Sequence, residues 1–407
     1  EIMVVTGVQT CALPIFTTKT ISSWEAPAHY AGLHFNDLVS EAKKWVPIVK
    51  EDGADVIIVA AHTGEEGAAD IIPENQAKAL ATQVSGINAI VAGHAHKALN
   101  DLKLKNPEGK VVPIVEPGKW ANKVSKIDIA VNAAGSVTGL TTKNITMDTT
   151  SEDPAIIALI SPYQVKTLKY TSTILGQSTG EYKGNKQITE PTEIMELINK
   201  VQAGAAGTQL SIAAPLSSSA YIPKGDVTIK NIMGAYIFEN FLYGVKMNGK
   251  QIKDWMEYTV RYYKQTSSSK DPIVKDKDLN IADYNLDQLY GASYDIDLTE
   301  PKGEIDSVTK KIKSGNRIKN LKVNGKLVKD SDVFTVAINN YRYSGGGGFM
   351  AAAGISSVDT SLVTYDSAKK LGDDGQVRSL MIKYVKDNKT ITPTTSKNWK
   401  ISTSLKK

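Results

Sequence analysis

Two short apolar runs limit the fold of this chain more than any other feature. Residues 55–61 (DVIIVAA) and 89–92 (AIVA) are each continuously apolar after their first positions and contain several β-branched side chains. Such runs are typical of strands buried on both faces of a sheet. Residues 76–84 have helical periodicity, so strand, helix and strand alternate. This order predicts an α/β fold built on an open sheet, and we assign the whole chain to the α/β and α+β classes.

The length of 407 residues is enough for two domains of about 100–200 residues each. Helical periodicity at 154–168 follows a polar segment, and we place the boundary there. We expect a first domain at 17–147, a linker helix and hinge at 148–168, a second domain at 169–390 and a polar tail at 391–407. Residues 1–16 lack the basic region and cleavage site of a signal peptide. They resemble a translated sequencing adapter, and we interpret them as artefactual or foreign to the domain.

Composition excludes several classes of protein. The formal net charge is +5, from 48 basic and 43 acidic residues, which is too mild to indicate polymeric nucleic acid as a partner. The sequence has no run of about 18 apolar residues, so no membrane-spanning helix is predicted. Cys11 is the single cysteine, so no intrachain disulfide can form. Scarce cysteine fits a secreted protein, although many cytosolic proteins share it.

Three of the five histidines follow the two buried strands. His62 ends the first apolar run, and His94 and His96 follow the second in a Gly-His-x-His pattern. Open α/β sheets bind ligands at this edge, and neutral imidazole is a common metal ligand. The alternative is that backbone groups cap these side chains and no metal binds. A two-metal site also needs a bridging carboxylate, and no Asp-x-His or Gly-Asn-His precedes His62.

Four consecutive glycines, Gly345, Gly346, Gly347 and Gly348, follow a predicted strand at 332–338. Such a run is entropically costly in regular structure, but it lets a backbone approach a ligand closely. Tyr341 precedes it, and an aromatic face can stack on a nucleobase for about 1–3 kcal/mol. The alternative is a flexible loop with tyrosines in the core.

A third group of candidate residues is Tyr284-Asn285-Leu286-Asp287. Tyr284 could face Tyr341 across a base, and Asp287 could accept hydrogen bonds from the base or the ribose. The alternative is a structural role, which is common for tyrosines near strands.

Together these motifs resemble the bacterial 2′,3′-cyclic-nucleotide 2′-phosphodiesterase/3′-nucleotidases, a branch of the 5′-nucleotidase superfamily. The resemblance extends over residues 17–389, and its most specific pieces are Gly93-His94-Ala95-His96 and residues 339–349. It implies the C-terminal part of a metallophosphoesterase sandwich, with two sheets flanked by helices. A 5′-nucleotidase-type C-terminal α/β domain would follow.

The resemblance also implies roles for individual residues. His62 and His94 would bind one divalent metal ion and His96 a second, with Mn, Zn, Fe, Co and Mg all possible. Tyr284 and Tyr341 would stack on the base. The further substrate contacts would be Asp287, Asn340, Arg342, Gly345, Gly346 and Gly347.

Two departures from the family pattern qualify the expected activity. The arginine-containing phosphate motif of true 5′-nucleotidases is replaced by Ala213-Ala214-Pro215-Leu216, which favours the cyclic phosphodiesterase branch. The Asp-x-His and Gly-Asn-His motifs are absent, so we expect an incomplete metal site, no assigned catalytic residue and a truncated N-terminus.

For the complete protein we therefore expect metal-dependent hydrolysis of nucleoside 2′,3′-cyclic phosphates and 3′-nucleotides in nucleotide catabolism. The alternatives are an inactive nucleoside-binding module and a 5′-nucleotidase. The partner would be a small nucleotide, and the location extracellular, wall-associated or periplasmic.

Overall fold

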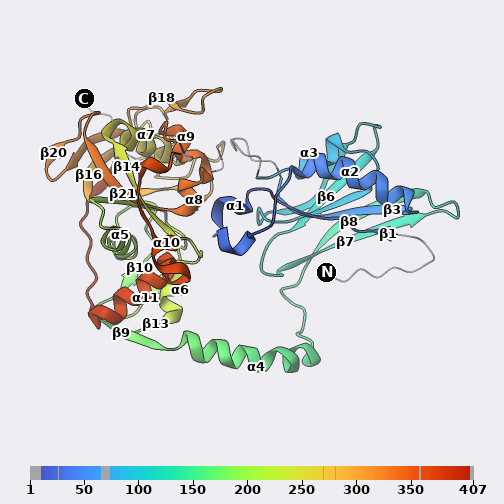
Figure 1. Cartoon of the computed structure of the whole chain (residues 1–407), viewed down its shortest axis with the longest axis horizontal. Coiled ribbons are helices and arrows are strands. Elements are labelled where there is room, and N and C mark those ends of the chain that lie inside the picture. Colours follow the sequence, from blue (N-terminus) through green and yellow to red (C-terminus); the bar gives the residue numbers. More distant parts are fainter. Residues whose placement is uncertain are drawn as a thin grey trace. The chain divides into compact units, whose positions relative to one another are not determined.

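The computed structural model describes residues 11–25, 27–65, 74–268, 270–279, 281–356 and 359–403. The chain divides into two compact units, Glu1–Ile156 and Ile157–Lys407 (Figure 1). The division falls inside the range 148–168 that the sequence assigned to a linker.

The first unit is built on a six-stranded sheet with the order β1-β3-β4-β6-β5, and β2 also pairs with β3. The strands are β1 (Cys11–Ala12), β2 (Ile15–Thr17), β3 (Val56–His62), β4 (Ala89–Ala92), β5 (Ala98–Lys105) and β6 (Val111–Pro117). All neighbouring strands are parallel except β5 and β6. The predicted α/β arrangement of this part of the chain is therefore confirmed. Its first two strands were not predicted, because residues 11–17 have no clear apolar period.

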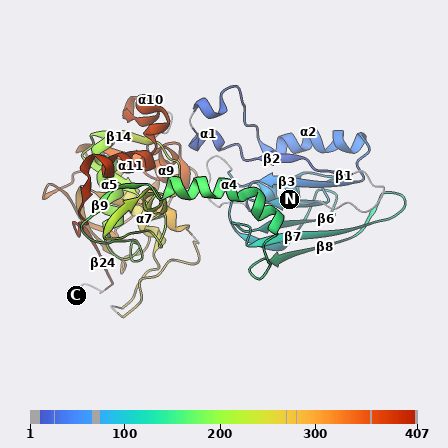
Figure 2. The ribbon, with the colours of Figure 1, turned by 90° about the horizontal axis from the view of Figure 1, so that it is seen from below.

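Helices α2 (Leu38–Glu51) and α3 (Ala77–Gln83) pack on one face of this sheet, against the apolar side chains of β3 and β4. Asp37 caps α2 by accepting a hydrogen bond from the backbone N–H of Ser40. Pro47 lies inside α2 without ending it. A hairpin of β7 (Lys123–Val131) and β8 (Val137–Thr146) forms the second sheet, on the opposite side from α2 (Figure 2).

The second unit has a five-stranded mixed sheet with the order β15-β11-β21-β14-β22. The strands are β11 (Leu210–Ala213), β14 (Leu242–Asn248), β15 (Gln288–Tyr290), β21 (Val333–Asn339) and β22 (Val363–Asp366). Helices α5 (Glu193–Ala206), α6 (Ile229–Ala235) and α11 (Val377–Asn388) share one hydrophobic core with this sheet. Helices α7 (Gly249–Thr259) and α9 (Phe349–Ala352) share a second core on the other side (Figure 1).

Smaller sheets surround this centre. The strands β16 (Ala292–Asp297), β19 (Ile318–Val323), β20 (Lys326–Leu327) and β24 (Trp399–Ser402) form one, and β9 (Ile174–Ser178), β13 (Gly225–Thr228) and β23 (Thr390–Ile391) form another. Trp399 and Ile391 are buried, so part of the tail expected at 391–407 belongs to the folded unit. Residues 391–407 are mostly polar, so the sequence did not predict that these two apolar side chains are buried.

The boundary between the two units, between Ile156 and Ile157, lies within helix α4 (Pro154–Thr171). The helix predicted at 154–168 is confirmed by α4. It has no buried residue, and its large apolar side chains include Leu159 and Val165, both more than 60% exposed. Among the described residues, none of the helices has the length and apolar character needed to cross a membrane.

Candidate functional site

The glycine-rich motif begins where β21 ends. The side chain of Asn339 accepts a hydrogen bond from the backbone N–H of Arg342, with an N···O distance of 2.8 Å, and starts helix α8 (Asn340–Tyr343). After α8 the backbone turns through Gly345 at φ 100° and Gly347 at φ 72°. These are left-handed conformations that side chains with a Cβ disfavour. The run therefore forms a tight turn, η4 (Gly346–Gly348), rather than a loose loop.

Arg342 lies inside the wall that this motif forms. Its side chain is 4% exposed, and its Nε and Nη2 atoms each lie 2.9 Å from a carboxylate oxygen of Asp287, whose side chain is 1% exposed. Burial alone would lower the pKa of Arg342, but the Asp287 carboxylate outweighs it and the pKa is raised. The family resemblance predicts both residues as direct substrate contacts. In the structure they are bonded to each other and are largely removed from solvent.

The same guanidinium connects two segments that are far apart in the sequence. Nη2 donates to the carbonyl oxygen of Tyr284 at 2.6 Å, and Nη1 donates to that of Gly346 at 3.3 Å. Trp255 donates from Nε1 to Asp287 Oδ2 at 2.9 Å, which fixes the carboxylate from a second side. Arg342 and Asp287 thus hold the turn at Tyr284 against the glycine turn.

Asn340 makes a comparable connection to a third segment. It is 5% exposed, and its side-chain oxygen accepts hydrogen bonds from the backbone N–H of Phe241 at 3.1 Å and from Asn240 Nδ2 at 3.2 Å. Asn340, another predicted substrate contact, therefore anchors the 236–241 loop to α8. A sequence cannot distinguish an asparagine of this kind from one that faces a ligand.

Two of the tyrosines reach the surface beside this buried frame. Tyr284 lies in η3 (Asp283–Asn285) and is 43% exposed. Tyr341 is partly buried, with its ring over Gly346 and 5.4 Å from Arg342 Cζ. Tyr343 belongs instead to the core and stacks on Tyr243 with ring centroids 4.7 Å apart. The structure therefore brings Tyr284, Tyr341 and the glycine turn together around Arg342.

Sequence reasoning missed Phe238, which is also exposed near this wall. Phe238 is 41% exposed, and its ring centroid lies 6.3 Å from that of Tyr284, with an angle of 80° between the ring planes. It precedes Glu239-Asn240, which contributes to the family resemblance. A single phenylalanine after a helix is usually a core residue, so the sequence contained no clear signal for its exposure.

The three histidines lie at the strand ends where the sequence placed them. His62 ends β3, and His94 and His96 follow β4, which is the parallel neighbour of β3. The ring centroids of His62 and His94 are 5.0 Å apart. His94 and His96 have φ values of 70° and 58°, which non-glycine residues seldom adopt outside functional or tightly held segments.

Electrostatics favour the neutral form of two of these side chains. Burial lowers the pKa of His62, and the nearby His94 and His96 lower it further. Burial and the Lys119 charge likewise lower the pKa of His96. Neutral imidazole is the form that binds metals. Next to the loop that contains His94 and His96, Glu116 is buried and accepts a hydrogen bond from the backbone N–H of Lys97 at 3.1 Å. Burial raises the pKa of Glu116 to about 7.

These residues fit a metal ion only in part. His62 and His94 approach each other, but His94 Nε2 lies 2.6 Å from Glu74 Oε1 and is engaged there. Within the described ranges, which omit residues 66–73, no group of three His, Cys, Asp or Glu side chains is arranged to hold a metal ion. Glu66 and Asp70 lie in the omitted range. The described side chains thus include possible metal ligands but do not form a complete metal site.

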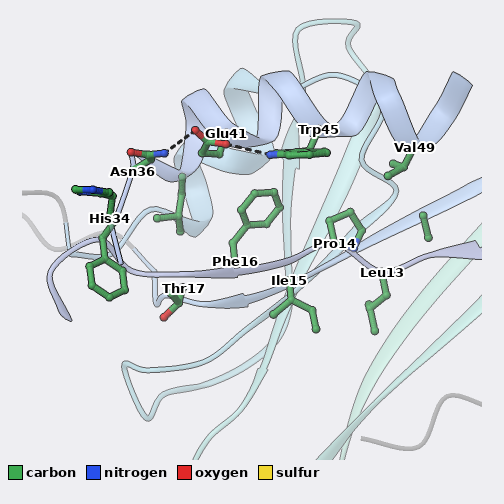
Figure 3. Close-up of a pocket in the computed structure, with 13 residues that line it drawn as sticks. Leu13, Pro14, Ile15, Phe16, Thr17, His34, Asn36, Glu41, Trp45 and Val49 are labelled. Atoms are coloured by element: carbon green, nitrogen blue, oxygen red, sulfur yellow. Dashed lines mark hydrogen bonds between the residues drawn. The ribbon is translucent and has the colours of Figure 1, made fainter. Parts of the chain in front are cut away.

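A cavity of about 510 Å³ lies elsewhere in the first unit, between α2 and the strands β1 and β2. Figure 3 shows Phe16 and Trp45 facing it, with Glu41 bonded to Asn36 and to Trp45 at its rim. None of the candidate site residues lines this cavity. Residues 12–16, which belong to the segment 1–16 that the sequence predicts to be foreign to the domain, form much of its wall, so no role is assigned to the cavity.

Comparison with known proteins finds relatives that are named as nucleotide phosphoesterases. The sequence model of the 5′-nucleotidase C-terminal domain matches residues 174–354. The chain is 27% identical over 420 residues to the trifunctional nucleotide phosphoesterase protein YfkN of Bacillus subtilis, covering 95% of this chain and 28% of that protein. It is 28% identical over 382 residues to the 2′,3′-cyclic-nucleotide 2′-phosphodiesterase/3′-nucleotidase of Haemophilus influenzae, covering 81% of this chain and 56% of that protein.

Solved structures agree on the fold. A candidate 5′-nucleotidase from Staphylococcus aureus superposes with a TM-score of 0.73 at 20% identity, covering 98% of this chain and 74% of that one. The 5′-nucleotidase precursor of Thermus thermophilus gives a TM-score of 0.63 at 20% identity, covering 99% and 74%. The predicted metallophosphoesterase-type domain followed by a 5′-nucleotidase C-terminal domain is confirmed.

The chain spans between about a quarter and just over half of the length of these two curated relatives. Their names describe hydrolases of nucleotide phosphoesters, and the predicted family resemblance is confirmed. The chain is a homologue of the bacterial 2′,3′-cyclic-nucleotide 2′-phosphodiesterase/3′-nucleotidases, within the 5′-nucleotidase superfamily.

Proposed function

We propose that the protein acts in the hydrolysis of nucleotide phosphoesters, with 2′,3′-cyclic nucleotides and 3′-nucleotides as substrates, and that its second unit holds the nucleoside. The proposal rests on one observation above all. The partly exposed rings of Tyr284 and Tyr341 belong to two segments that the buried Arg342 joins directly. Rings presented on a fixed frame favour stacking on a planar base, since little ordering is required on binding.

The proposed preference for cyclic and 3′-phosphates rests on residues 213–216, which contain no arginine where the phosphate motif of true 5′-nucleotidases has one. Residues 213–216 lie at and beyond the end of β11, and Ala213 and Ala214 are buried and apolar. A 5′-monophosphate would find no guanidinium from this segment to form a bidentate pair. This supports cyclic and 3′-phosphates over 5′-monophosphates as substrates.

We further propose His62, His94 and His96 as ligands for the divalent ions used by metallophosphoesterases. Such ions polarise phosphoryl oxygens in hydrolysis. Because the described side chains do not complete a site, the proposal is limited to binding and assigns no reaction step. The expected location outside the cytoplasm stays a prediction.

A second candidate function is a nucleoside-binding module without turnover. It is favoured by the difference between the proposed nucleoside site around Arg342 and the proposed metal site at the three histidines. Arg342 is joined by hydrogen bonds to Asp287 in the frame of the nucleoside site, whereas His94 of the histidine site is hydrogen-bonded to Glu74.

Phosphate release from 2′,3′-cyclic AMP, 3′-AMP and 5′-AMP with added Mn²⁺ distinguishes these functions. The hydrolase proposal expects release from the first two substrates that disappears in His94→Ala. Saturable adenosine binding without release would instead identify the binding module. Release from 5′-AMP alone would refute the proposed substrate class.

A further inference from the structure

We propose that Tyr258 is a positioning residue of the nucleoside site, and that its hydroxyl holds the glycine turn in place beneath the ring of Tyr341. This inference rests on the proposed nucleoside-binding function. It adds to the site a residue of helix α7 that the sequence did not assign to it.

The contact is a hydrogen bond from the side chain of one helix to the backbone of the glycine turn. Tyr258 donates from its hydroxyl to the carbonyl oxygen of Gly347, with an O···O distance of 3.0 Å. A Cβ added to Gly348 would lie 2.9 Å from the same hydroxyl oxygen, so the next residue leaves no room for a side chain. The hydroxyl therefore lies against two successive residues of the turn.

This bond makes Tyr258 the second side chain that holds a carbonyl group of the turn. Arg342 of α8 donates to the carbonyl oxygen of Gly346 at 3.3 Å, and Tyr258 of α7 donates to that of Gly347. Glycine loses more conformational entropy on ordering than any other residue, so a glycine turn gains particular benefit from external bonds. The two helices thus hold successive peptide groups of η4.

The same peptide group also takes part in closing the turn. The carbonyl of Gly347 and the N–H of Gly348 belong to one planar peptide unit. That N–H donates to the carbonyl oxygen of Gly345 at an N···O distance of 2.9 Å. By fixing the carbonyl end of this unit, Tyr258 also fixes the direction of the N–H that closes the turn.

The ring of Tyr258 is itself held by its neighbours. It meets the buried ring of Phe349 edge to face, with centroids 4.9 Å apart and an angle of 81° between the planes. The guanidinium carbon of Arg261 lies 5.5 Å from the centroid of the Tyr258 ring, within the range of a cation–π contact. A ring restricted in this way loses little further entropy when its hydroxyl donates to the turn.

The glycine turn is also the surface on which the ring of Tyr341 rests. A Cβ added to Gly346 would lie 2.5–2.6 Å from three atoms of that ring. A turn that moved would allow the Tyr341 ring to move with it, and ordering a mobile ring when it stacks on a base lowers affinity. The contribution of the Tyr258 hydroxyl to binding should therefore depend on the presence of the Tyr341 ring.

Calorimetric titration of adenosine into the full chain and into Tyr258→Phe tests this role. The substitution removes the hydroxyl and keeps the ring, and the net strength of one hydrogen bond predicts a loss of affinity of about 2- to 10-fold. In a Tyr341→Ala background, Tyr258→Phe should cause no further loss. Tyr263→Phe is the matched control, because Tyr263 also donates its hydroxyl to a backbone carbonyl, that of Ile188, outside the turn. It should bind adenosine as the unaltered chain does.

Hydrogen exchange followed by mass spectrometry reports on the turn without a ligand. Exchange rates reflect the free energy of local opening, so the amides of residues 345–349 should exchange about 2- to 10-fold faster in Tyr258→Phe. The same amides should keep their rates in Tyr263→Phe. A thermal unfolding curve for each variant separates this local effect from a general loss of stability.

The two levels of the proposal fail in different ways. If the unaltered chain does not bind adenosine, the nucleoside-binding function is wrong and the inference falls with it. If the chain binds adenosine, an unchanged affinity in Tyr258→Phe, or an equal loss in Tyr263→Phe, would overturn the positioning role. Equal losses from Tyr258→Phe with and without the Tyr341 ring would overturn it as well, and so would equal exchange rates at 345–349 in the two phenylalanine variants.

Discussion

The guanidinium of Arg342 and the carboxylate of Asp287 form a doubly hydrogen-bonded pair inside the second unit, with Nε 2.9 Å from Oδ2 and Nη2 2.9 Å from Oδ1. The pair connects a turn at residues 283–285 with the glycine turn more than fifty positions later. Its burial makes it part of the frame of the proposed nucleoside site. Changes to it should therefore affect stability as well as binding.

Asp287→Ala should destabilise the second unit strongly. The substitution leaves Arg342 buried without its counter-charge, and breaking a buried pair in this way costs about 3–5 kcal/mol in free energy of unfolding. Urea unfolding followed by circular dichroism measures the loss. Asp387→Ala, which removes an exposed carboxylate paired with Lys383, is the control and should cost under about 1 kcal/mol. Similar losses in both variants would contradict the structural role of the buried pair.

Arg342→Lys should weaken nucleoside binding even where the protein folds. Lysine keeps the charge but lacks the planar fork that reaches Asp287 and the carbonyl oxygens of Tyr284 and Gly346 together. We expect adenosine affinity to fall in calorimetry because the two turns lose their common donor. Full affinity in this variant would show that the connection is unnecessary.

Replacing each of two glycines with alanine should distinguish the destabilisation caused by backbone strain from that caused by steric conflict. Gly345 has φ 100° with no atom within 4 Å of an added Cβ, so Gly345→Ala should cost about 1–2 kcal/mol from strain alone. Gly347 has φ 72°, and an added Cβ would lie 2.9 Å from Arg342 Nη1. Gly347→Ala should therefore lower both the free energy of unfolding and adenosine affinity further. Equal effects of the two substitutions would contradict this assignment.

The stability of the first unit should depend on the ionisation of Asp37. Burial opposes ionisation of this side chain, but hydrogen bonds from Gln76 and Ser40 and the charge of Lys19 outweigh it and lower its pKa below 3.8. A carboxyl whose pKa is lower in the folded state stabilises the fold above its ordinary pKa. That stabilisation is lost as the pH falls through the folded-state value.

Comparison of two variants isolates this effect. Asparagine caps helices about as well as aspartate, so Asp37→Asn should keep the cap of α2 and show a weaker loss of stability between pH 5 and roughly pH 2. Asp37→Ala should cost about 1 kcal/mol at neutral pH through loss of the cap. Urea unfolding at several pH values measures both. The same acid dependence in Asp37→Asn and in the unaltered chain would contradict the assignment.

The sequence predicted the parts of the fold in which local pattern and tertiary structure agree. The apolar runs at β3 and β4 and the histidines after them lie where expected, because a buried parallel strand must be apolar throughout and must end in a loop. The strands at residues 11–17 escaped prediction because they form by pairing with β3, which local periodicity does not reveal.

Within the proposed nucleoside site, the sequence identified the right segments but not the role of each side chain. Arg342 and Asp287 have the chemistry of ligand contacts, and only their mutual distance and burial show that they pair with each other. The exposure of Phe238 was not predicted because it depends on the bond that Arg378 donates to Ile237 and the bond that Asn340 accepts from Asn240, which hold its loop. Such relationships connect positions about 55 to 140 apart, which motif spacing does not predict.

The central claim is that the second unit binds a nucleoside between aromatic rings held around Arg342. Calorimetric titration of adenosine into the full chain, into Tyr341→Ala and into Tyr221→Ala tests it most directly. Tyr221 is a surface tyrosine, 43% exposed, that lies outside the α8 frame, so Tyr221→Ala is the control for loss of a tyrosine elsewhere in the unit. We predict saturable binding that weakens by about 1–3 kcal/mol in Tyr341→Ala and is unchanged in Tyr221→Ala. No saturable binding, or equal affinity in all three proteins, would contradict the claim.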